Sequence, residues 1–197
     1  MNKLTYHNQE AQGLLEVIVA LGIIISGIVG MVNLTISNQT ATSEASDRLI
    51  ATNFAREGIE VIRNIRDTNW LSCEINSGVL NCNDWDQGLS SDTTQTLVAL
   101  FDVTNNSWTL NYTASDFNHN HTRIWRRNAG VADEIGTHFQ STQDPPSNAT
   151  LAGYKRLITL SPLGSPKNGI KVQSSVQWTA KGKTEQLTLE ERLYNWR

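Results

Sequence analysis

Residues 17–32 read VIVALGIIISGIVGMV, sixteen consecutive positions without a charged side chain, among which Ser26 is the one polar residue. With its flanks the apolar stretch extends over residues 14–34, a length of 21 residues that only Glu16 interrupts. A helix of that length measures about 31 Å, and the hydrocarbon core of a bilayer is about 30 Å thick. The sequence therefore predicts one transmembrane helix near the amino end.

An apolar stretch of this kind also occurs as a buried core helix or as the apolar part of a secretory signal peptide. A signal peptide has a basic segment before its apolar run and a small-residue cleavage site after it. Here Glu10 opposes Lys3, and the polar string NLTISNQT at residues 33–40 follows the run. These observations favour a permanent membrane span over a signal peptide.

The composition of the whole chain argues against several other classes of protein. Its 197 residues include 16 Lys and Arg against 19 Asp and Glu, a net charge of −3, which disfavours a protein that coats nucleic acid. A mean hydropathy of −0.35 argues against a polytopic membrane protein. The two cysteines are too few for a disulfide-rich scaffold. The sequence has no nucleophile elbow, phosphate loop or metal-ligand cluster, so we expect neither catalysis nor a cofactor.

Glu16 is the unusual residue of the apolar stretch. A carboxylate drawn to the centre of a bilayer costs about 2.5–3.5 kcal/mol. At the interface, near the positive end of the helix dipole, the cost is smaller. The residue is therefore either an interfacial side chain or a carboxylate with a dedicated partner.

The residues around Glu16 carry a family resemblance. Residues 11–21, AQGLLEVIVAL, resemble the amino-terminal signature of type IV prepilins and pseudopilins. In that family a prepilin peptidase removes a short polar leader on the cytoplasmic side and methylates the new terminal amine. The fifth residue of the mature chain is Glu, and an apolar helix follows at once.

The resemblance implies a cut between Ala11 and Gln12, N-methylation of Gln12, and a role for Glu16 in assembly or in recognition by the peptidase. Ala11 stands where the family normally has Gly, and Gln12 stands where it often has Phe. A cut after Gly13 would make Glu16 only the third residue of the mature chain. We therefore place the cut after Ala11, where the spacing to Glu16 is that of the family.

Small residues recur at every fourth position of the apolar stretch, at Gly22, Ser26 and Gly30. On a helix they form one narrow seam along which another helix can approach closely. Glycine is also simply common in membrane helices. The resemblance favours helix packing, because the amino-terminal helices of pilins pack together in the filament core.

The helical pattern continues beyond the apolar stretch, because no proline precedes Pro145 and the apolar residues of 41–67 fall on one stripe. The stripe consists of Ile50, Phe54, Gly58, Val61 and Ile65, widened by Ile62. The other side carries Glu44, Arg48, Arg56, Glu57, Glu60, Arg63 and Arg66, which we interpret as a solvated face. We expect one helix over residues 14–67, terminated by Asn69 and Trp70. Its second half should pack under a globular head.

Cys73 and Cys82 follow the predicted helix, with a turn-rich segment between them. A disulfide between them would contribute about 2.5 kcal/mol through loop entropy, and it requires an oxidising compartment. Two free thiols in a reducing cytosol are the alternative. The predicted membrane span favours the disulfide, in a head outside the cytoplasm.

Residues 83–150 are the least informative part of the chain. They contain strand-like runs at 96–102 and 108–112 and a loop at 144–148. Four potential metal ligands lack the spacing of a metal site, and we interpret them as solvated loop side chains: Asp116, His119, His121 and His138. Four further residues have the composition of a small nucleic-acid patch, which the net charge disfavours: Arg123, Trp125, Arg126 and Arg127.

The carboxyl end predicts three strands, at 154–161, 170–180 and 184–195, with a two-residue hairpin turn at Lys181 and Gly182. That turn fixes the register of the last two strands. It pairs Val176 with Leu187, Ser174 with Leu189 and Ile170 with Leu193, all on the face of Trp178. Val172 opposite Glu191 is the one poor match in this register.

We predict an α+β fold in which a long amino-terminal helix packs against a carboxyl-terminal antiparallel sheet, the architecture of pilins. The predicted parts are a cytoplasmic leader (1–11), a transmembrane helix (12–34), its amphipathic continuation (35–68) and an extracytoplasmic β-rich head (69–197). The protein would lie in the cytoplasmic membrane with its amino end inside, and then in a cell-surface filament.

The resemblance implies a structural subunit, a minor pilin of a type IV pilus-like filament. Its partners would be a prepilin peptidase, other pilin subunits, an inner-membrane assembly platform and membrane lipid. One alternative is a pseudopilin of a type II secretion or DNA-uptake machine. The other is a permanent single-pass, membrane-anchored binding module, which would keep residues 1–11 uncut.

Overall fold

The structure of the chain is a computed structural model. It describes residues 9–72, 74–76, 79–81, 85–89, 93–102, 105, 107–128, 136–164 and 168–195, and for 9–12, 74–76 and 79–81 it describes the backbone alone. The chain divides into two compact units, Met1–Asp47 and Arg48–Arg197.

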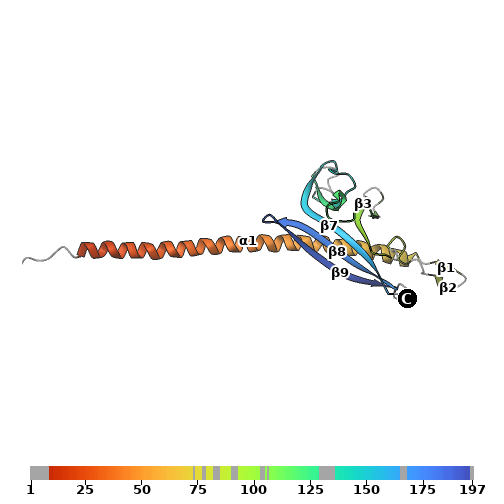
Figure 1. Cartoon of the computed structure of the whole chain (residues 1–197), viewed down its shortest axis with the longest axis horizontal. Coiled ribbons are helices and arrows are strands. Elements are labelled where there is room, and N and C mark those ends of the chain that lie inside the picture. Colours follow the sequence, from red (N-terminus) through yellow and green to blue (C-terminus); the bar gives the residue numbers. More distant parts are fainter. Residues whose placement is uncertain are drawn as a thin grey trace, which may run out of the picture. The chain divides into compact units, whose positions relative to one another are not determined.

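Helix α1, Gln9–Leu71, comprises 63 residues (Figure 1). It contains no proline, so each of its interior N–H groups can donate to the preceding turn. At its end the Ser72 hydroxyl donates to the Asn69 carbonyl at 2.8 Å and satisfies one of the last free carbonyls. The predicted helix is confirmed, and it continues to Leu71. We call residues 13–47 of α1 its exposed half and residues 48–71 its packed half.

Nine strands follow α1 within the described part of the chain, and a short 3-10 helix, η1 (Asn120–Thr122), precedes the fifth. The strands are β1 (Glu74–Asn76), β2 (Val79–Asn81), β3 (Gln95–Asp102), β4 (Ser107–Asn111), β5 (Arg123–Arg127), β6 (His138–Gln140), β7 (Ala149–Leu163), β8 (Gly169–Ala180) and β9 (Lys183–Tyr194). β1 and β2 form a two-stranded sheet, and the other seven strands form one antiparallel sheet. The predicted α+β fold is confirmed.

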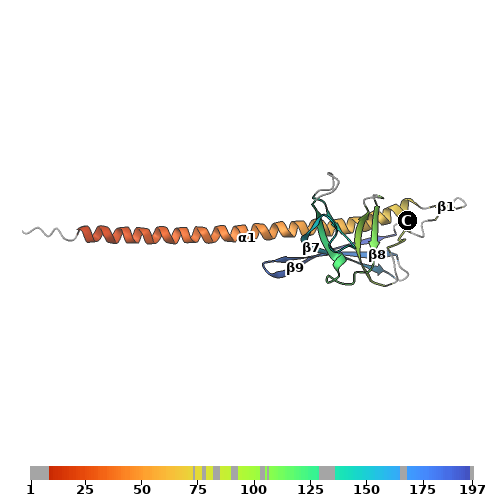
Figure 2. The ribbon, with the colours of Figure 1, turned by 90° about the horizontal axis from the view of Figure 1, so that it is seen from above.

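β7 is the strand around which the seven-stranded sheet is arranged. One edge of β7 pairs with β8, which in turn pairs with β9. Its other edge is shared, because β5 pairs with the amino-terminal part of β7 and β3 with the carboxyl-terminal part. β6 and β4 extend the sheet from β5 and β3. Figures 1 and 2 show β7, β8 and β9 beside the packed half of α1.

The β8–β9 hairpin has the register that the sequence predicts. Val176 pairs with Leu187, Ser174 with Leu189 and Ile170 with Leu193. The turn residues Lys181 and Gly182 have φ angles of 51° and 75°. Positive φ at both positions is the geometry of a type I′ turn, whose twist matches that of the flanking strands.

The packed half of α1 covers one face of the sheet, which we call the inner face. Ile59, Val61 and Ile62 pack with apolar residues of β3, β7, β8 and β9, and Phe54 packs with apolar residues of β5 and β8. The predicted stripe is wrong at its first position, because Ile50 is 38% exposed whereas Ala51 is fully buried. The stripe in the structure is rotated toward the side of α1 that carries Ala51.

The opposite face of the sheet, which we call the outer face, has a smaller apolar cluster. Val98, Ala114 and Leu157 are buried there, with Leu100 and Phe117 packed against them. Ala114 and Phe117 belong to the segment between β4 and η1, which therefore covers part of the outer face.

Candidate functional site

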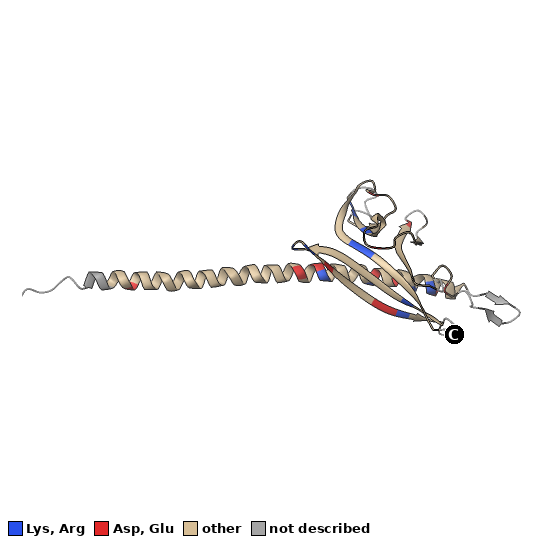
Figure 3. Cartoon of the chain, viewed as in Figure 1, with Lys and Arg blue, Asp and Glu red and all other residues tan. Residues whose placement is uncertain are grey.

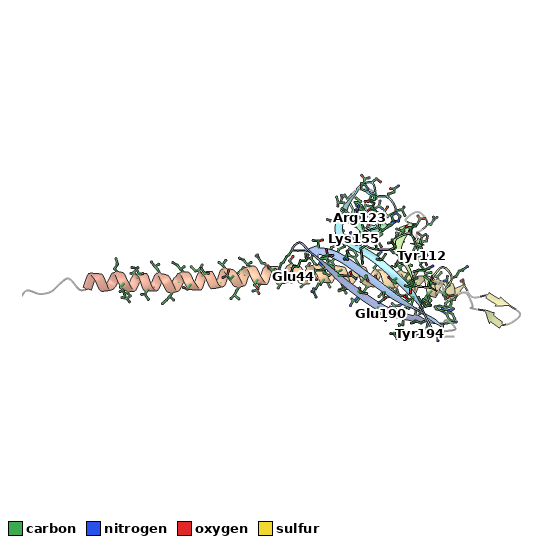
Figure 4. The ribbon with its side chains drawn as sticks, viewed as in Figure 1. Glu44, Tyr112, Arg123, Lys155, Glu190 and Tyr194 are labelled. Carbon is green, nitrogen blue, oxygen red and sulfur yellow. The ribbon has the colours of Figure 1, made fainter. Side chains whose placement is uncertain are left out.

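The exposed half of α1 carries a continuous band of exposed apolar side chains. The large apolar residues from Leu14 to Ile36 are each 50–70% exposed. Figure 4 shows side chains that project from this segment on all sides. By length and composition α1 is the one described helix able to cross a membrane, and none of its most apolar window is buried.

Exposed apolar surface of this extent marks a membrane or an interaction site, because soluble monomers rarely expose apolar patches above a few hundred Å². A helix that is apolar on every side needs an apolar environment on every side. In the described part of the chain none of the most apolar window of α1 is buried, unlike the core helix of a soluble protein. Its composition and exposure are compatible with a single-pass membrane helix.

Glu16 lies on the exposed half, and its side chain is exposed. From Gly13 to Asp47 the sequence contains no Lys or Arg, so this segment offers the carboxylate no basic side chain (Figure 3). In an apolar environment an unpaired carboxylate is costly, and the role of Glu16 in assembly or in recognition by the peptidase stays a prediction.

The predicted cleavage position lies in the first turns of α1. Ala11 and Gln12 are helical in their backbone, and their side chains lie outside the described part of the chain. The last turn at either end of a helix frays readily, so the peptide bond between Ala11 and Gln12 is in the part of α1 that opens most easily. The cut and the methylation of Gln12 stay predictions.

The small residues of the predicted packing seam leave open space beside the helix. A Cβ atom added at Gly22 or Gly30 would meet nothing within 4 Å. The Ser26 hydroxyl donates to the Gly22 carbonyl at 2.7 Å, so this polar group is satisfied within the helix and needs no water. The seam is therefore compatible with lipid and with a neighbouring helix, and its role in helix packing stays a prediction.

The face of the packed half that we interpreted as solvated is only partly so. Arg63 donates to both carboxylate oxygens of Glu191 on β9, each at 2.6 Å, and it also pairs with Glu60. The hydrogen bond to Glu191 raises the pKa of Arg63 above its ordinary value. This contact also explains the poor match of Val172 with Glu191, because the carboxylate is held by the helix rather than by the opposite strand.

A buried polar network joins the packed half of α1 to the sheet around Arg156. The Arg156 side chain is 2% exposed and donates to the Phe54 carbonyl at 3.1 Å and to the Gln140 amide oxygen at 2.9 Å. It also lies 3.4 Å from the Glu57 carboxylate. Burial lowers the pKa of Arg156, and Glu57 acts in the opposite direction. The network therefore fixes one position of α1 on the inner face, since its polar atoms are satisfied only there.

The buried roles of Arg156 and Gln140 were not predicted from the sequence, although one signal for Arg156 was present. Arg156 alternates with Ile158 and Leu160 and so shares the inner face with them. A charged residue on a predicted buried face indicates a buried partner.

The helix approaches the sheet most closely at Gly58. A Cβ atom at this position would lie 2.5 Å from the Ser174 Oγ and 3.3 Å from atoms of Arg156 and Ile158. A side chain larger than hydrogen therefore cannot fit there without a shift of its neighbours. Gly58 lies on the predicted stripe, and its contact with the sheet explains why a residue without a side chain occupies a core position.

The residues weighed as metal ligands do not converge. No group of three or more His, Cys, Asp or Glu side chains suited to a metal occurs among the described residues. The His119 and His121 rings are in contact, with centroids 4.4 Å apart, whereas His138 packs against Phe54 in the core region of α1. Asp116 caps a turn by accepting from the Asn118 N–H at 2.7 Å.

The residues weighed as a nucleic-acid patch do not form one surface. Trp125 is 4% exposed, so its ring is not available for stacking on a base. Arg123 pairs with Asp144 at 2.6 Å, and the Arg127 guanidinium lies 4.7 Å from the centre of the Phe139 ring. Arg126 alone is exposed, on the opposite side of β5 from its two neighbours.

Cys73 and Cys82 lie outside the described residues, and their disulfide stays a prediction. Comparisons of the chain with protein-family models, with curated proteins and with solved structures gave no match.

Proposed function

We propose that this chain is a minor pilin, a structural subunit of a type IV pilus-like filament. The observation that supports the proposal is the exposed half of α1, an unburied apolar helix that begins beside the lone carboxylate of Glu16. The same helix continues into a packed half that holds a β-sheet head. A helix that is apolar on all sides suits a protein that lies first in a membrane and then packs with similar helices in an assembly.

In the proposed mechanism a prepilin peptidase removes residues 1–11 and methylates the new amine of Gln12. Glu16 then lies about 6 Å along the helix from the new terminus. In lipid or in a filament core an opposite charge at close range is worth far more than in water. The terminal amine of a neighbouring, staggered subunit would pair with the Glu16 carboxylate. A wrong stagger would leave that charge unpaired, so Glu16 acts as a register check.

The proposal includes a definite topology and set of partners. The chain inserts into the cytoplasmic membrane with its amino end inside and its head outside, and it then enters a surface filament. Its partners are the prepilin peptidase, other pilin subunits, the inner-membrane assembly platform and membrane lipid. The seam of Gly22, Ser26 and Gly30 would face neighbouring helices, because it leaves space for a close approach.

Two alternatives make different predictions. A pseudopilin of a secretion or DNA-uptake machine would be processed in the same way, and only its assembly with other components would differ. A permanently anchored binding module would keep residues 1–11. The state of the amino terminus therefore separates the filament classes from the anchored module.

The experiment is the intact mass of the full chain after coexpression with a prepilin peptidase. The proposal predicts a mature chain that begins at a methylated Gln12. Coexpression with an inactive peptidase is the control and should leave Met1 or its usual processing product. Removal of Lys3 and Glu10 leaves the formal charge unchanged, so mass rather than gel charge is the readout. A chain that begins at Leu14, or one that keeps residues 1–11, contradicts the proposed cut.

A further inference from the structure

The outer face of the sheet carries two basic side chains directly opposite each other. Lys171 on β8 and Arg192 on β9 are cross-strand partners. Their strand neighbours Ile170, Val172 and Leu193 are buried in the core that the sheet forms with α1. Because successive side chains on a strand alternate between its faces, Lys171 and Arg192 both project from the outer face. The proposed assembly function makes no use of this pair.

The two basic residues form the kind of cross-strand pair in which side chains come closest. The two-residue turn makes Ala180 and Lys183 a hydrogen-bonded pair. Hydrogen-bonded and non-hydrogen-bonded pairs alternate along an antiparallel ladder, so Lys171 and Arg192, nine pairs further along, form a non-hydrogen-bonded pair. In such a pair the Cα atoms are about 4.5 Å apart. Like charges directly opposite each other repel, so this pair lowers the stability of the hairpin.

The Glu190 carboxylate lies beside the pair on β9 but does not neutralise both cations (Figure 4). It lies 3.6 Å from the Arg192 guanidinium and accepts a hydrogen bond from the Gln173 side-chain amide at 3.2 Å. Among the described residues the Lys171 side chain has no ion pair or hydrogen bond. Lys171, Arg192 and Glu190 together therefore leave a net positive charge on this part of the outer face.

A hydroxyl group and an aromatic ring flank the two cations on the same face. Ser161 on β7 is the other cross-strand partner of Lys171. Its hydroxyl accepts from the Thr94 hydroxyl at 3.1 Å, which leaves the Ser161 proton for another acceptor. Tyr194 on β9 is 45% exposed, and its ring lies against Gly169, where an added Cβ atom would be 2.8 Å from the ring. We define the outer-face basic site as Ser161, Lys171, Arg192 and Tyr194.

The backbone of β9 adds further donors and acceptors beside this site. Among the described strands β9 pairs with β8 alone, so its other edge is free. Residues of non-hydrogen-bonded pairs turn their N–H and C=O groups away from the partner strand, so those of Arg192 and Tyr194 point to the free edge. Unpaired groups at a strand edge form hydrogen bonds readily with other molecules.

We infer that the outer-face basic site binds the phosphate ester of a sugar. Two adjacent cations match the double negative charge of a phosphate monoester, and the bound anion offsets the repulsion between them. The Ser161 hydroxyl donates to the same phosphate group. The exposed Tyr194 ring matches the apolar C–H face of a sugar, and the backbone groups at the free edge match its hydroxyls. The inference does not depend on the proposed filament, because the site belongs to the head alone.

The test measures binding of glucose 6-phosphate to the full chain in detergent micelles by isothermal titration calorimetry. Glucose is the control for a sugar without phosphate, and inorganic phosphate is the control for an anion without a sugar. Lys171→Gln and Arg192→Gln each remove one cation of the site. Lys183→Gln is the matched control, because Lys183 is an exposed cation at the opposite end of β9. Urea unfolding of each variant shows whether its head is folded.

We expect saturable binding of glucose 6-phosphate that is weakened about tenfold or more by Lys171→Gln or by Arg192→Gln, as for the loss of a hydrogen bond to a charged group. Lys183→Gln should leave binding within about twofold of the parent. Lys171→Gln should also unfold at a urea concentration equal to or above that of the parent, because it removes the repulsion with Arg192.

A parent chain without saturable binding of glucose 6-phosphate overturns the inference, and so does an equal loss of binding with Lys183→Gln. Glucose or inorganic phosphate that binds as strongly as glucose 6-phosphate overturns it as well. A lower urea midpoint for Lys171→Gln would contradict the repulsion from which the inference is drawn. Because the experiment needs no processing at Ala11, its failure is distinct from a failure of the proposed filament function.

Discussion

The two halves of α1 belong to one helix but differ in what covers them. In the exposed half, large apolar side chains are 50–70% exposed on every side. In the packed half, Ala51, Ala55 and Ile62 are fully buried, while Arg56 and Glu60 are exposed. The packed half needs only one covering surface, which the sheet of the same chain provides. Residues 14–36 of the exposed half are apolar on every side, and their large apolar side chains are not buried in the described part of the chain, which is compatible with a single-pass membrane helix.

The largest difference between the two halves should be seen in the free energy of unfolding when one isoleucine is truncated in each half. Ile62 is fully buried against the sheet, whereas Ile28 is 56% exposed. Ile62→Ala should lower the free energy of unfolding of the head by about 2–5 kcal/mol, because it removes buried apolar atoms and leaves a cavity. Ile28→Ala should leave it unchanged within about 0.5 kcal/mol.

The measurement is urea unfolding of the full chain in micelles, followed by tryptophan fluorescence, to which the buried Trp70, Trp85, Trp125 and Trp178 contribute. Equal destabilisation by the two substitutions would show that the exposed half is also packed in the folded monomer, against the present account.

A smaller effect should come from a methyl group added at matched glycines. At Gly58 the new Cβ atom would approach the Ser174 Oγ to 2.5 Å, whereas at Gly27 it would meet nothing within 4 Å. Overpacking costs about 1–3 kcal/mol, and the better helix propensity of Ala returns up to about 1 kcal/mol. Gly58→Ala should therefore destabilise the head by about 1 kcal/mol in the same unfolding assay, and Gly27→Ala should not. A Gly58→Ala variant more stable than the parent would mean that helix and sheet are less closely packed than described.

The smallest effect concerns pH and the contact of β6 with the packed half. Burial beside Phe54, and then the charge of Arg126, lower the pKa of His138, while Glu57 acts in the opposite direction. Between the lowered pKa and the ordinary value of about 6.5, the unfolded chain binds a proton that the folded head does not. The stability of the head should therefore fall as the pH falls through this window.

The check is the unfolding free energy of the head between pH 7.5 and 5 for the parent and for His138→Gln. The variant should show a shallower decline over this range, since Gln does not titrate. Identical pH profiles would mean that His138 has the same pKa in the folded and unfolded chains.

Local patterns of the sequence were sufficient for the elements whose partners lie close along the chain. The turn at Lys181 and Gly182 fixes the β8–β9 register, because a two-residue turn with positive φ leaves no freedom of pairing. The helical spacing of the apolar residues over 41–67, together with the absence of an interrupting proline, was sufficient for the continuous helix. The spacing of apolar residues predicted an apolar stripe on the packed half. The centre of the predicted stripe was misplaced, because periodicity alone does not show which side of the helix the sheet buries most deeply.

Contacts between segments that are distant in the sequence could not be predicted from local patterns. Arg63 and Glu191 are 128 positions apart, so local spacing could not predict their ion pair. The face of α1 that we interpreted as solvated therefore contacts the sheet in part. Arg156 finds its partners on α1 and β6, and β5 and β6 were not predicted as strands. Leu100 of β3, Arg127 of β5 and Phe139 of β6 line one pocket together with the loop after β6, and no spacing in the sequence indicates that these segments meet.

The central claim is that the exposed half of α1 is the assembly element of the protein, with Glu16 as its register residue. The most direct test compares Glu16→Ala with Glu60→Ala, a matched change in the packed half, where Glu60 is exposed beside Arg63. Cells are separated into membrane and sheared-surface fractions, and the processed chain is quantified in each. The account predicts that Glu16→Ala is cut and inserted normally but is depleted from the sheared filaments, while Glu60→Ala is recovered like the parent. Normal recovery of Glu16→Ala in filaments would contradict the claim, and loss of its cleavage would assign Glu16 to recognition by the peptidase instead.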